Sequence, residues 1–409
     1  MFHLFLSVAV LGLITSSVFA GMVLAGARHH IRRGKSLTLK EGFVPALSLL
    51  KPLHGTEPGL EKNLTSFYEQ DYPPSRFEVL YCARSEDDAG LELARQVAAR
   101  YPQVTSRFFS TGAPRYINAK VHSLELMTAA ADHGILAISD SDVRVGRGYL
   151  RAVAAPFADA KVGAMTCLYR GVAIEGGLWA RLESVGMSVE MTAGVLVANL
   201  LEGMRFVLGP TMAVRRECVE KMGGMGRLGD LCSDDYILGN EIYLQGRKVE
   251  LSRYVIDHIV IHSTFEESLK HQARWMKSTR FSRPKGHLGT ALTFSTPFGL
   301  LALLMGVALG RPVLGAVLFA WSVASRLAIA WAAGRVVEVS KSDASLLDLY
   351  LLYPLRDLMG FGFWAASYFS SKIVWRGREY NLLPGGKMRA AERVSASAVE
   401  EHTSGAEAR

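Results

Sequence analysis

Apolar residues fill the first part of the chain almost without interruption. From residue 1 to residue 27 the only ionisable side chain is His3, and the basic stretch Arg28-His29-His30-Ile31-Arg32-Arg33-Gly34-Lys35 follows directly. About 20 apolar residues suffice to cross a bilayer. A secretory signal peptide carries its positive charges before its apolar core, not after it. The pattern therefore predicts an uncleaved transmembrane anchor over residues 1–27, with its amino end outside and the following chain in the cytoplasm.

Between residues 38 and 285, short apolar runs alternate with polar stretches that suit helices. This alternation is typical of one soluble α/β domain. Helices are expected at Gly59–Glu69 and Gly90–Arg100, and the second places Leu91, Ala94 and Val97 on one side. Strands are expected at Val44–Leu50, Phe77–Cys82, Arg107–Phe109, Gly134–Ile138, Val162–Cys167 and Arg247–Leu251.

The composition changes after Lys285. Leu288–Gly310 and Pro312–Gly334 are apolar and long enough to span a bilayer, although the second contains Arg326. A third apolar stretch, Leu346–Phe369, is interrupted by Arg356-Asp357, which either pair internally, face an aqueous cavity or mark an interfacial segment. Residues 288–375 therefore hold two or three membrane segments.

The basic residues that follow bear on this choice. Three spans would place them outside, against the positive-inside tendency, so two spans plus an interfacial or re-entrant segment is the alternative. Residues 394–409 are rich in Ser, Ala and Glu and are expected to be disordered. The basic residues concerned are Lys372, Arg376, Arg378, Lys387 and Arg389.

The chain of 409 residues has a formal charge of +8. Its basic residues are scattered and cluster beside apolar segments, which favours membrane phosphates and a nucleotide as partners and excludes nucleic acid. The four cysteines show no Cys-x-x-Cys spacing and no accompanying histidine pattern, so we expect reduced, mostly buried thiols. These are Cys82, Cys167, Cys218 and Cys232.

One predicted strand ends abruptly in two carboxylates. Ile135-Leu136-Ala137-Ile138 carries no charge and is followed by Ser139-Asp140-Ser141-Asp142. Ligands of open α/β sheets gather at the carboxyl ends of such strands, and two carboxylates there need a cation. A divalent ion, Mg²⁺ or Mn²⁺, held together with a substrate phosphate meets that need. A polar turn or helix cap is the alternative.

Two further acidic clusters and one basic cluster are candidates for chemistry. Glu86-Asp87-Asp88 follows a predicted strand and either contacts a nucleotide or caps the next helix. Ser233-Asp234-Asp235 precedes a helix expected from Tyr236 to Gln245, where a carboxylate either accepts a proton from a hydroxyl group or caps the helix. Arg274 and Trp275 lie just before the membrane segments and either serve a diphosphate and a sugar or belong to an interfacial belt.

The order of these elements resembles the family 2-type glycosyltransferases, and more specifically the ceramide glucosyltransferase-like group called family 21. The resemblance spans about residues 44–275 and includes the tail from Trp375-Arg376-Gly377 to Gly385-Gly386-Lys387. It rests on Leu49-Leu50-Lys51-Pro52-Leu53-His54-Gly55, on Asp71-Tyr72-Pro73 with Glu78-Val79-Leu80, on Asn118-Ala119-Lys120-Val121, and on the ordered Asp88, Asp140, Asp235 and Arg274-Trp275.

This resemblance implies a GT-A (Rossmann-like) α/β domain and an inverting, UDP-sugar-dependent transfer. Asp88, Lys120 and Asp140 would bind the nucleotide, while Asp142 and Asp140 would hold a divalent metal. Asp235 would be the general base. Arg274 would stabilise the departing diphosphate and Trp275 would contact the sugar or the acceptor.

The sequence departs from the family pattern at two places. His271 stands at the first position of the Gln-x-x-Arg-Trp motif, with Gln272 one residue late, and Asp142 completes a full Asp-x-Asp where animal ceramide enzymes commonly have glycine. In having Asp142 and this arrangement of membrane segments, the sequence resembles the branch of the family found in bacterial hopanoid biosynthesis. That likeness implies transfer of N-acetylglucosamine from its UDP donor to bacteriohopanetetrol, at a bacterial inner membrane, by a catalytic domain in the cytoplasm.

Other activities remain open at this point. One alternative is a related enzyme that acts on ceramide with UDP-glucose, or on polyprenyl phosphate. Another is a non-catalytic membrane protein that only binds a nucleotide sugar. All three matched aspartates are present, which favours an enzyme.

Overall fold

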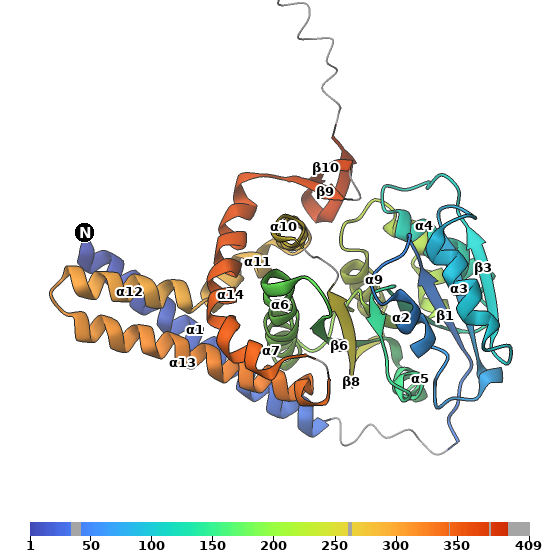
Figure 1. The fold of residues 1–409 in the computed structure, drawn as a ribbon, viewed down its shortest axis with the longest axis horizontal. Helices are drawn as coiled ribbons and strands as arrows, with labels where there is room; N and C mark the ends of the chain where they lie inside the picture. Colours follow the sequence, from blue (N-terminus) through green and yellow to red (C-terminus); the bar gives the residue numbers. More distant parts are fainter. Residues whose placement is uncertain (34–41, 261–263, 343, 376–377, 392–409) are drawn as a thin grey trace, which may run out of the picture.

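The computed structural model describes residues 1–33, 42–260, 264–342, 344–375 and 378–391. Figure 1 shows a sheet domain from which a bundle of helices projects to one side. The predicted disordered tail, residues 394–409, lies outside the described residues.

The centre of the sheet domain is an eight-stranded sheet of order β3-β2-β1-β4-β7-β6-β8-β5. Strands β1, β2, β3 and β4 run parallel, whereas β7 is antiparallel to both of its neighbours. Six strands match the predicted ones, but β5 and β7 were not predicted. The strands are β1 Leu47–Pro52, β2 Phe77–Ala83, β3 Thr105–Ser110, β4 Ile135–Ser139, β5 Val143–Arg144, β6 Val162–Ala173, β7 Thr211–Arg215 and β8 Lys248–Val260.

Helices connect these strands and cover the sheet. The predicted helices appear as α2 and α3, and the helix expected from Tyr236 begins two residues earlier, so Asp235 lies inside its first turn. The helices of this domain are α2 Leu60–Ser66, α3 Ala89–Ala99, α4 Ala119–Ala130, α5 Tyr149–Ala154, α8 Arg216–Lys221, α9 Asp234–Leu244, α10 Phe265–Ser282 and α11 Pro284–Thr290.

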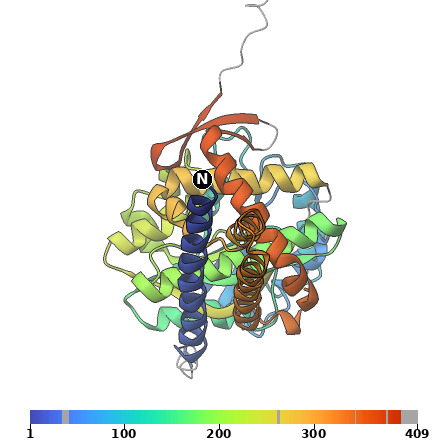
Figure 2. The same cartoon turned by 90° about the vertical axis from the view of Figure 1, so that its left-hand side faces the viewer.

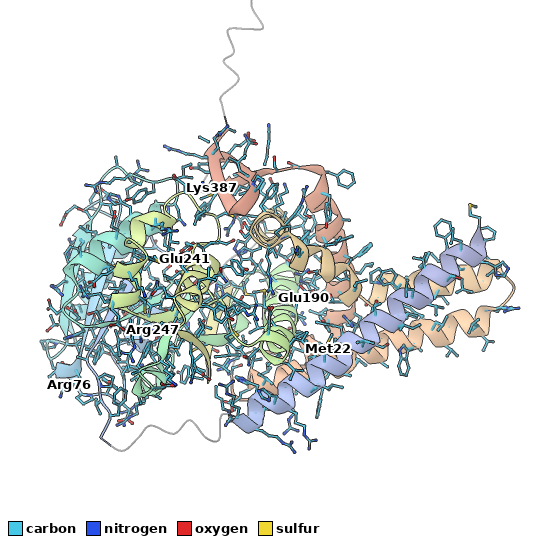
Figure 3. All side chains as sticks on the ribbon, turned by 180° about the vertical axis from the view of Figure 1, so that it is seen from behind. Met22, Arg76, Glu190, Glu241, Arg247 and Lys387 are labelled. Atoms are coloured by element: carbon cyan, nitrogen blue, oxygen red, sulfur yellow. The ribbon has the colours of Figure 1, made fainter. Side chains whose placement is uncertain are left out.

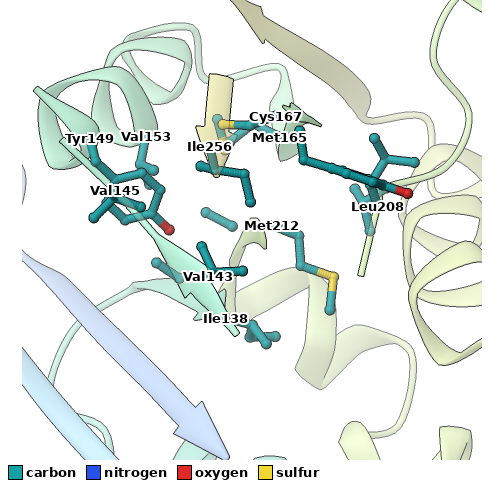
Figure 4. Packing of buried hydrophobic residues seen from close by; sticks show 14 of the residues in the cluster. Ile138, Val143, Val145, Tyr149, Val153, Met165, Cys167, Leu208, Met212 and Ile256 are labelled. Atoms are coloured by element: carbon teal, nitrogen blue, oxygen red, sulfur yellow. The ribbon is translucent and has the colours of Figure 1, made fainter. Parts of the chain in front are cut away.

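Strand β4 is central because every one of its residues is buried. Ile138 at its end pairs with Leu50 of β1, and Leu50 pairs with Leu80 of β2, so these strands finish at the same edge of the sheet. Ile138, Val143 and Met212 belong to the main buried core and lie close together (Figure 4). The residues that follow Ser139 therefore lie on a tightly packed apolar core.

A long apolar helical segment that the sequence pattern did not reveal packs on β6. It comprises α6 (Gly177–Val185), a π-helical stretch (Gly186–Met191) and α7 (Thr192–Glu202). Gly171 of β6 permits the contact, because a Cβ there would lie 2.5 Å from Ser184 Cα. By length and hydropathy this segment could cross a membrane, yet 61% of its most apolar window is buried inside the protein.

Three helices lie side by side and project away from the sheet domain (Figures 1 and 2): α1 (Phe2–Arg33), α12 (Thr296–Ala308) and α13 (Pro312–Val336). The N-terminus lies at the free end of this bundle. Both α1 and α13 are long and apolar enough to span a membrane, and α12 forms a pair with the preceding helical residues Pro284–Thr293, bent by 45°. The apolar segments predicted at residues 1–27, 288–310 and 312–334 therefore supply the helices of one bundle.

Helix α14 (Leu346–Ala366) crosses the base of the bundle. Its Arg356 and Asp357 do not pair with each other. Arg356 contacts Glu190 at 2.9 Å, and Asp357 Oδ1 contacts Arg326 of α13 at 3.0 Å. Figure 3 shows Glu190 at this junction between the sheet domain and the bundle. The charged pair of the sequence thus joins three separate helical segments, while Leu347, Leu351 and Leu355 form an exposed apolar stripe on α14.

The chain continues into a small antiparallel sheet of β9 (Lys372–Trp375), β10 (Arg378–Leu383) and β11 (Lys387–Ala390), which the sequence pattern did not predict. The range 288–375, predicted to hold membrane segments, therefore also contains strand β9. A β-bridge joins Lys387 to Leu231 of the sheet domain. The basic residues of this small sheet consequently lie on the same side of the bundle as the sheet domain.

All four cysteines are free, and Cys82, Cys167 and Cys218 are buried while Cys232 is partly exposed. The expectation of mostly buried thiols is confirmed.

The buried pair between Arg326 and Asp357 leads to a stability prediction. Asp357 also accepts hydrogen bonds from the backbone N–H groups of Ser295 and Thr296, at 3.0 and 2.7 Å. Asp357→Ala leaves Arg326, only 1% exposed, without its counter-charge. We expect a loss of about 3–5 kcal/mol in the free energy of unfolding.

Thermal unfolding of the purified protein in detergent measures this loss. The control is Glu61→Ala, which removes an exposed ion pair with Arg100 and should change stability by less than about 1 kcal/mol. Equal melting temperatures for the two variants would contradict the role given to Asp357.

Candidate active site

The two carboxylates that follow β4 each have a cationic partner. Asp140 Oδ1 lies 2.5 Å from Lys120 Nζ, and Asp142 Oδ2 lies 3.0 Å from His258 Nε2. Burial raises the pKa of Asp140, although Lys120 opposes this shift. Burial would also raise the pKa of Asp142, but His258 and Lys51 hold it below its usual value. Neighbouring charges therefore make Asp142 the more readily ionised of the two.

Lys120 connects this pair to the start of α9. Its helix α4 is preceded by Asn118. The side chain of Asn118 caps the helix by accepting a hydrogen bond from Lys120 N, and it donates a hydrogen bond to Asp234 Oδ1 at 3.2 Å. Burial would lower the pKa of Lys120, but Asp140, Asp234 and Asp235 together raise it. Lys120 is therefore a partly buried cation that interacts with all three of these carboxylates.

Asp235 lies in the first turn of α9. Burial and the neighbouring Asp234 raise the pKa of Asp235 to about 6. Gly209 faces it so closely that a Cβ there would lie 3.0 Å from Asp235 Oδ2. The nearby rings of Phe206 and Tyr236 lie 5.9 Å apart. A carboxylate with this pKa can accept a proton near neutral pH, which suits a general base.

Lys51 and Glu57, two residues not predicted for the site, support the carboxylates from β1 and from the loop after it. Lys51 is fully buried and donates a hydrogen bond from Nζ to the backbone oxygen of Asp140 at 2.7 Å. Burial lowers the pKa of Lys51 to about 7. Glu57 accepts a hydrogen bond from Ser141, and burial together with Asp142 raises the pKa of Glu57 to about 7. In the sequence, only Lys51 lies in a stretch that resembles a family motif, Lys51-Pro52-Leu53, and nothing pointed to Glu57.

Asp88 acts as a helix cap. It accepts hydrogen bonds from the backbone N–H groups of Gly90 and Leu91 at the start of α3, and from that of Gly55 after β1. These contacts are the ones expected if Asp88 caps the helix that follows it. It lies just beyond the end of β2, at the edge where β1 and β4 also finish, so a nucleoside contact stays a prediction.

Helix α10 carries the predicted basic and aromatic group. His271 Nδ1 lies 2.7 Å from Glu183 of α6, and its ring centroid lies 4.3 Å from that of Trp275. The guanidinium of Arg274 lies over the ring of Trp375, 5.6 Å from its centroid. His271, which stands at the first position of the altered Gln-x-x-Arg-Trp motif, therefore connects α10 to α6. Gln272 is buried and donates to Ser268.

Side chains of the interfacial-belt alternative also make contacts within the protein, and both assignments stay predictions. Lys277 donates to the backbone oxygen of Lys372, Arg280 donates to that of Ser367, and Arg283 pairs with Glu202. Trp275 is partly buried against the main core. These contacts connect α10 to β9, to the end of α14 and to α7.

The residues fit a divalent ion through their chemistry. Asp142 Oδ1 is buried and has no hydrogen-bond partner among the described residues. No group of three or more His, Cys, Asp or Glu side chains arranged around a metal occurs within the part of the chain that the structure describes. Mg²⁺ and Mn²⁺ need no such group when substrate phosphates complete their coordination, so Asp142 and Asp140 suffice as protein ligands.

A cavity of about 670 Å³ lies away from these carboxylates. It is open beside α5 and β8, near the end of α13. Its lining includes Arg144, Arg170 and Arg253 but none of Asp140, Asp142 and Asp235. We therefore do not assign the substrate site to it.

Comparison with known proteins identifies the family of the chain. The sequence profile described as Glycosyl transferase family 21 matches residues 8–388, which is most of the chain. The chain belongs to glycosyl transferase family 21. The prediction that it is a glycosyltransferase is thereby confirmed.

Individual relatives agree with this assignment. The chain is 23% identical to ceramide glucosyltransferase 1 of Caenorhabditis elegans over 363 residues, covering 85% of this chain and 74% of the relative. It is 34% identical to the ceramide glucosyltransferase of Komagataella phaffii over 111 residues, covering 26% of this chain and 21% of the relative.

Among solved structures, the mannosyltransferase PcManGT of Pyrobaculum calidifontis, in complex with GDP-Man and Mn2+, matches with a TM-score of 0.51. The match has 19% identity and covers 88% of this family 21 chain and 97% of the other. This likeness confirms the predicted GT-A-type α/β fold. A closer relation to the hopanoid branch than to the ceramide enzymes stays a prediction.

The contact between His258 and Asp142 yields a binding prediction. His258 is 6% exposed, and Asp142 holds its pKa above the usual value although burial alone would lower it. His258→Phe keeps a ring but removes the hydrogen bond that orients Asp142. Loss of such a partner typically weakens metal binding by about 10- to 100-fold.

Calorimetric titration of UDP in the presence and absence of Mn²⁺ measures this effect. Asp142→Asn should lose more of the metal-dependent affinity than His258→Phe. The control is His287→Phe, since His287 is also buried but forms a hydrogen bond with Ser367, just after α14. Metal-dependent affinity unchanged in His258→Phe would contradict the orienting role.

Proposed function

We propose that this family 21 glycosyltransferase moves a sugar from a nucleoside diphosphate sugar to the hydroxyl group of a membrane lipid, with inversion at the anomeric carbon. The observation that carries the proposal is the position of Lys120, in contact with Asp140 and close to Asp234 and Asp235. Inverting transfer needs a diphosphate site and a proton acceptor close together, on opposite sides of the reacting carbon.

We assign the diphosphate to the edge that carries Asp140 and Asp142, and the nucleoside to the neighbouring end of β2, where Asp88 lies. A bound Mg²⁺ or Mn²⁺ ion, held by Asp142 and Asp140, would neutralise charge on the diphosphate. The presence of GDP-Man and Mn2+ in the solved mannosyltransferase supports a divalent ion. UDP is our choice of nucleotide because of the family resemblance.

Asp235 is our candidate for the general base. Its carboxylate takes the proton of the acceptor hydroxyl while the oxygen of that hydroxyl forms a bond to the anomeric carbon. The bond from this carbon to the diphosphate oxygen breaks on the opposite face, and the electron pair leaves with the nucleotide. The resulting glycoside is β-linked when the donor is an α-linked sugar nucleotide.

The departing diphosphate gains negative charge in this step. Lys120 and Arg274 are the cations that we assign to it, and Arg274 can bind two phosphate oxygens at once through its planar guanidinium. Trp275 offers a flat apolar face on the same helix for the sugar or the acceptor.

The lipid acceptor is proposed because the site lies beside a membrane bundle. Helix α10 packs against α14, and α14 crosses the base of α12 and α13. For the donor and acceptor we retain N-acetylglucosamine and bacteriohopanetetrol, with the catalytic domain on the cytoplasmic side of a bacterial inner membrane. Glucose and ceramide form the second candidate pair, which the names of the related proteins favour.

Product analysis distinguishes these pairs. Membranes that contain the protein are incubated with labelled UDP-N-acetylglucosamine or UDP-glucose and with bacteriohopanetetrol or ceramide, and the lipids are examined by mass spectrometry. A glycosylated hopanoid supports the first pair, and a glucosylceramide supports the second. Absence of any glycolipid, with wild-type UDP binding, would contradict a lipid acceptor.

Asp235→Asn tests the general base. The amide cannot accept the proton, and general-base catalysis is typically worth about 10²- to 10⁴-fold, so kcat should fall by that amount while UDP binding stays near wild type. Because the pKa of Asp235 is about 6, the kcat/KM of the wild type should fall as pH decreases below about 6. Steady-state rates between pH 5 and pH 8 provide both measurements, and an Asn variant with most of its activity would exclude this role.

A further inference from the structure

The small C-terminal sheet touches the segment that leads into α9. Cys232 N donates to the oxygen of Gly386 at 2.9 Å, and Met388 N donates to the oxygen of Asp230 at 2.7 Å. The β-bridge between Leu231 and Lys387 lies between these two hydrogen bonds. Asp234 and Asp235 follow within three residues of Cys232, so backbone pairing with β11 fixes the approach to the proposed base.

The same sheet touches α10. The guanidinium of Arg274 stacks over Trp375 of β9. Lys277 Nζ donates to the backbone oxygen of Lys372 at 2.7 Å. Gly386 faces Ser282, where a Cβ on Gly386 would lie 2.4 Å from Ser282 Oγ. Ser282 Oγ in turn donates to Ser233 Oγ at 3.0 Å, which joins α10 to the start of α9.

A third segment meets the sheet through apolar contacts. Ile373, Leu382 and Met388 form a buried cluster, against which Ile117 and Phe281 pack. Ile117 immediately precedes Asn118, which caps α4 and contacts Asp234. The sheet therefore touches the three segments that carry Lys120, Asp235 and Arg274.

We propose that the β9–β11 sheet is a positioning element of the active site, which we call the C-terminal clasp. It supplies no reacting group and holds the starts of α4 and α9 and the middle of α10 in one arrangement. Within it, Trp375 is a positioning residue that orients Arg274. This inference rests on the roles proposed above for Asp235 and Arg274.

The physical reason lies in the chemistry of Arg274. A guanidinium at the end of a long side chain has many rotamers, and ordering it during the reaction costs entropy. An aromatic ring beneath it restricts these rotamers by contacting the face of the guanidinium rather than its N–H edge. Removal of the ring should therefore lower kcat more than it weakens donor binding.

Trp375→Ala tests this role, and Trp331→Ala is the matched control. Trp331 lies under Arg335 in the same kind of stacked pair, 5.4 Å from ring centroid to guanidinium, on α13 away from the site. We expect Trp375→Ala to lower kcat by about 10-fold, with UDP affinity within about twofold of wild type. Trp375→Phe keeps an aromatic face and should recover most of the rate, while Trp331→Ala should retain wild-type kcat.

A double-mutant cycle of Trp375→Ala with Arg274→Ala shows whether Trp375 affects kcat through Arg274. If Trp375 acts through Arg274, the double variant should be no slower than Arg274→Ala alone. Independent, multiplicative losses in the double variant would overturn the positioning role of Trp375. So would a kcat in Trp375→Ala equal to that of Trp331→Ala.

Gly386 and Gly385 give a second matched pair. Both have positive φ angles, 77° and 78°, so alanine strains the backbone equally at either position. Only at Gly386 would the added Cβ meet another residue, because nothing lies within 4 Å of the corresponding position at Gly385. Gly386→Ala should displace Ser282 and lower kcat at least about fivefold relative to Gly385→Ala.

These outcomes separate the clasp from the proposed function. Equal rates for Gly386→Ala and Gly385→Ala, together with wild-type kcat in Trp375→Ala, would refute the clasp and leave the roles of Asp235 and Arg274 intact. High activity in Asp235→Asn or Arg274→Ala would instead refute those roles. Melting temperatures of all variants verify that each one is folded.

Discussion

The constraint on which the rest of the site depends is charge compensation at the end of β4. Asp140, Asp142, Asp234 and Asp235 lie near one another in a largely buried region, and Lys120 is the cation common to them. An isolated buried carboxylate is costly to ionise, so the arrangement requires that cation and keeps the pKa of Asp235 close to neutral pH. Asp142, the proposed ligand of the divalent ion, has His258 as its cationic partner.

Buried charge also determines how the sheet domain joins the membrane bundle. Arg326 of α13 and Arg356 of α14 have Asp357 and Glu190 as partners, and Asp357 additionally accepts two backbone N–H groups before α12. Such pairs are strongly destabilising to break, because one charge remains without compensation. They therefore specify one relative position of the helices, which holds α10 and the active site beside the bundle.

Much of the fold could be predicted because its signals are local. The apolar runs that became β1, β2, β4 and β6 and the acidic strand end at Asp140 are readable residue by residue. Short antiparallel strands such as β5 and β7, and the apolar segment Gly177–Glu202, escaped prediction because their burial is created by neighbours distant in sequence. His258, Lys51 and Glu57 were missed for the same reason, since each is common in isolation and gains meaning only from Asp140, Ser141 and Asp142.

The sequence by itself determined the α/β class, the membrane segments and the identity of the acidic and basic groups, because these follow from periodicity and from the order of motifs. Only the tertiary structure decided which charged groups contact one another. It paired Lys120 with Asp140, made Asp88 a helix cap, and joined Arg356 and Asp357 to separate partners. It also brought the last strands back against α10 and against the segment that precedes α9. Ion pairs and packing depend on distance in space, which sequence separation does not encode.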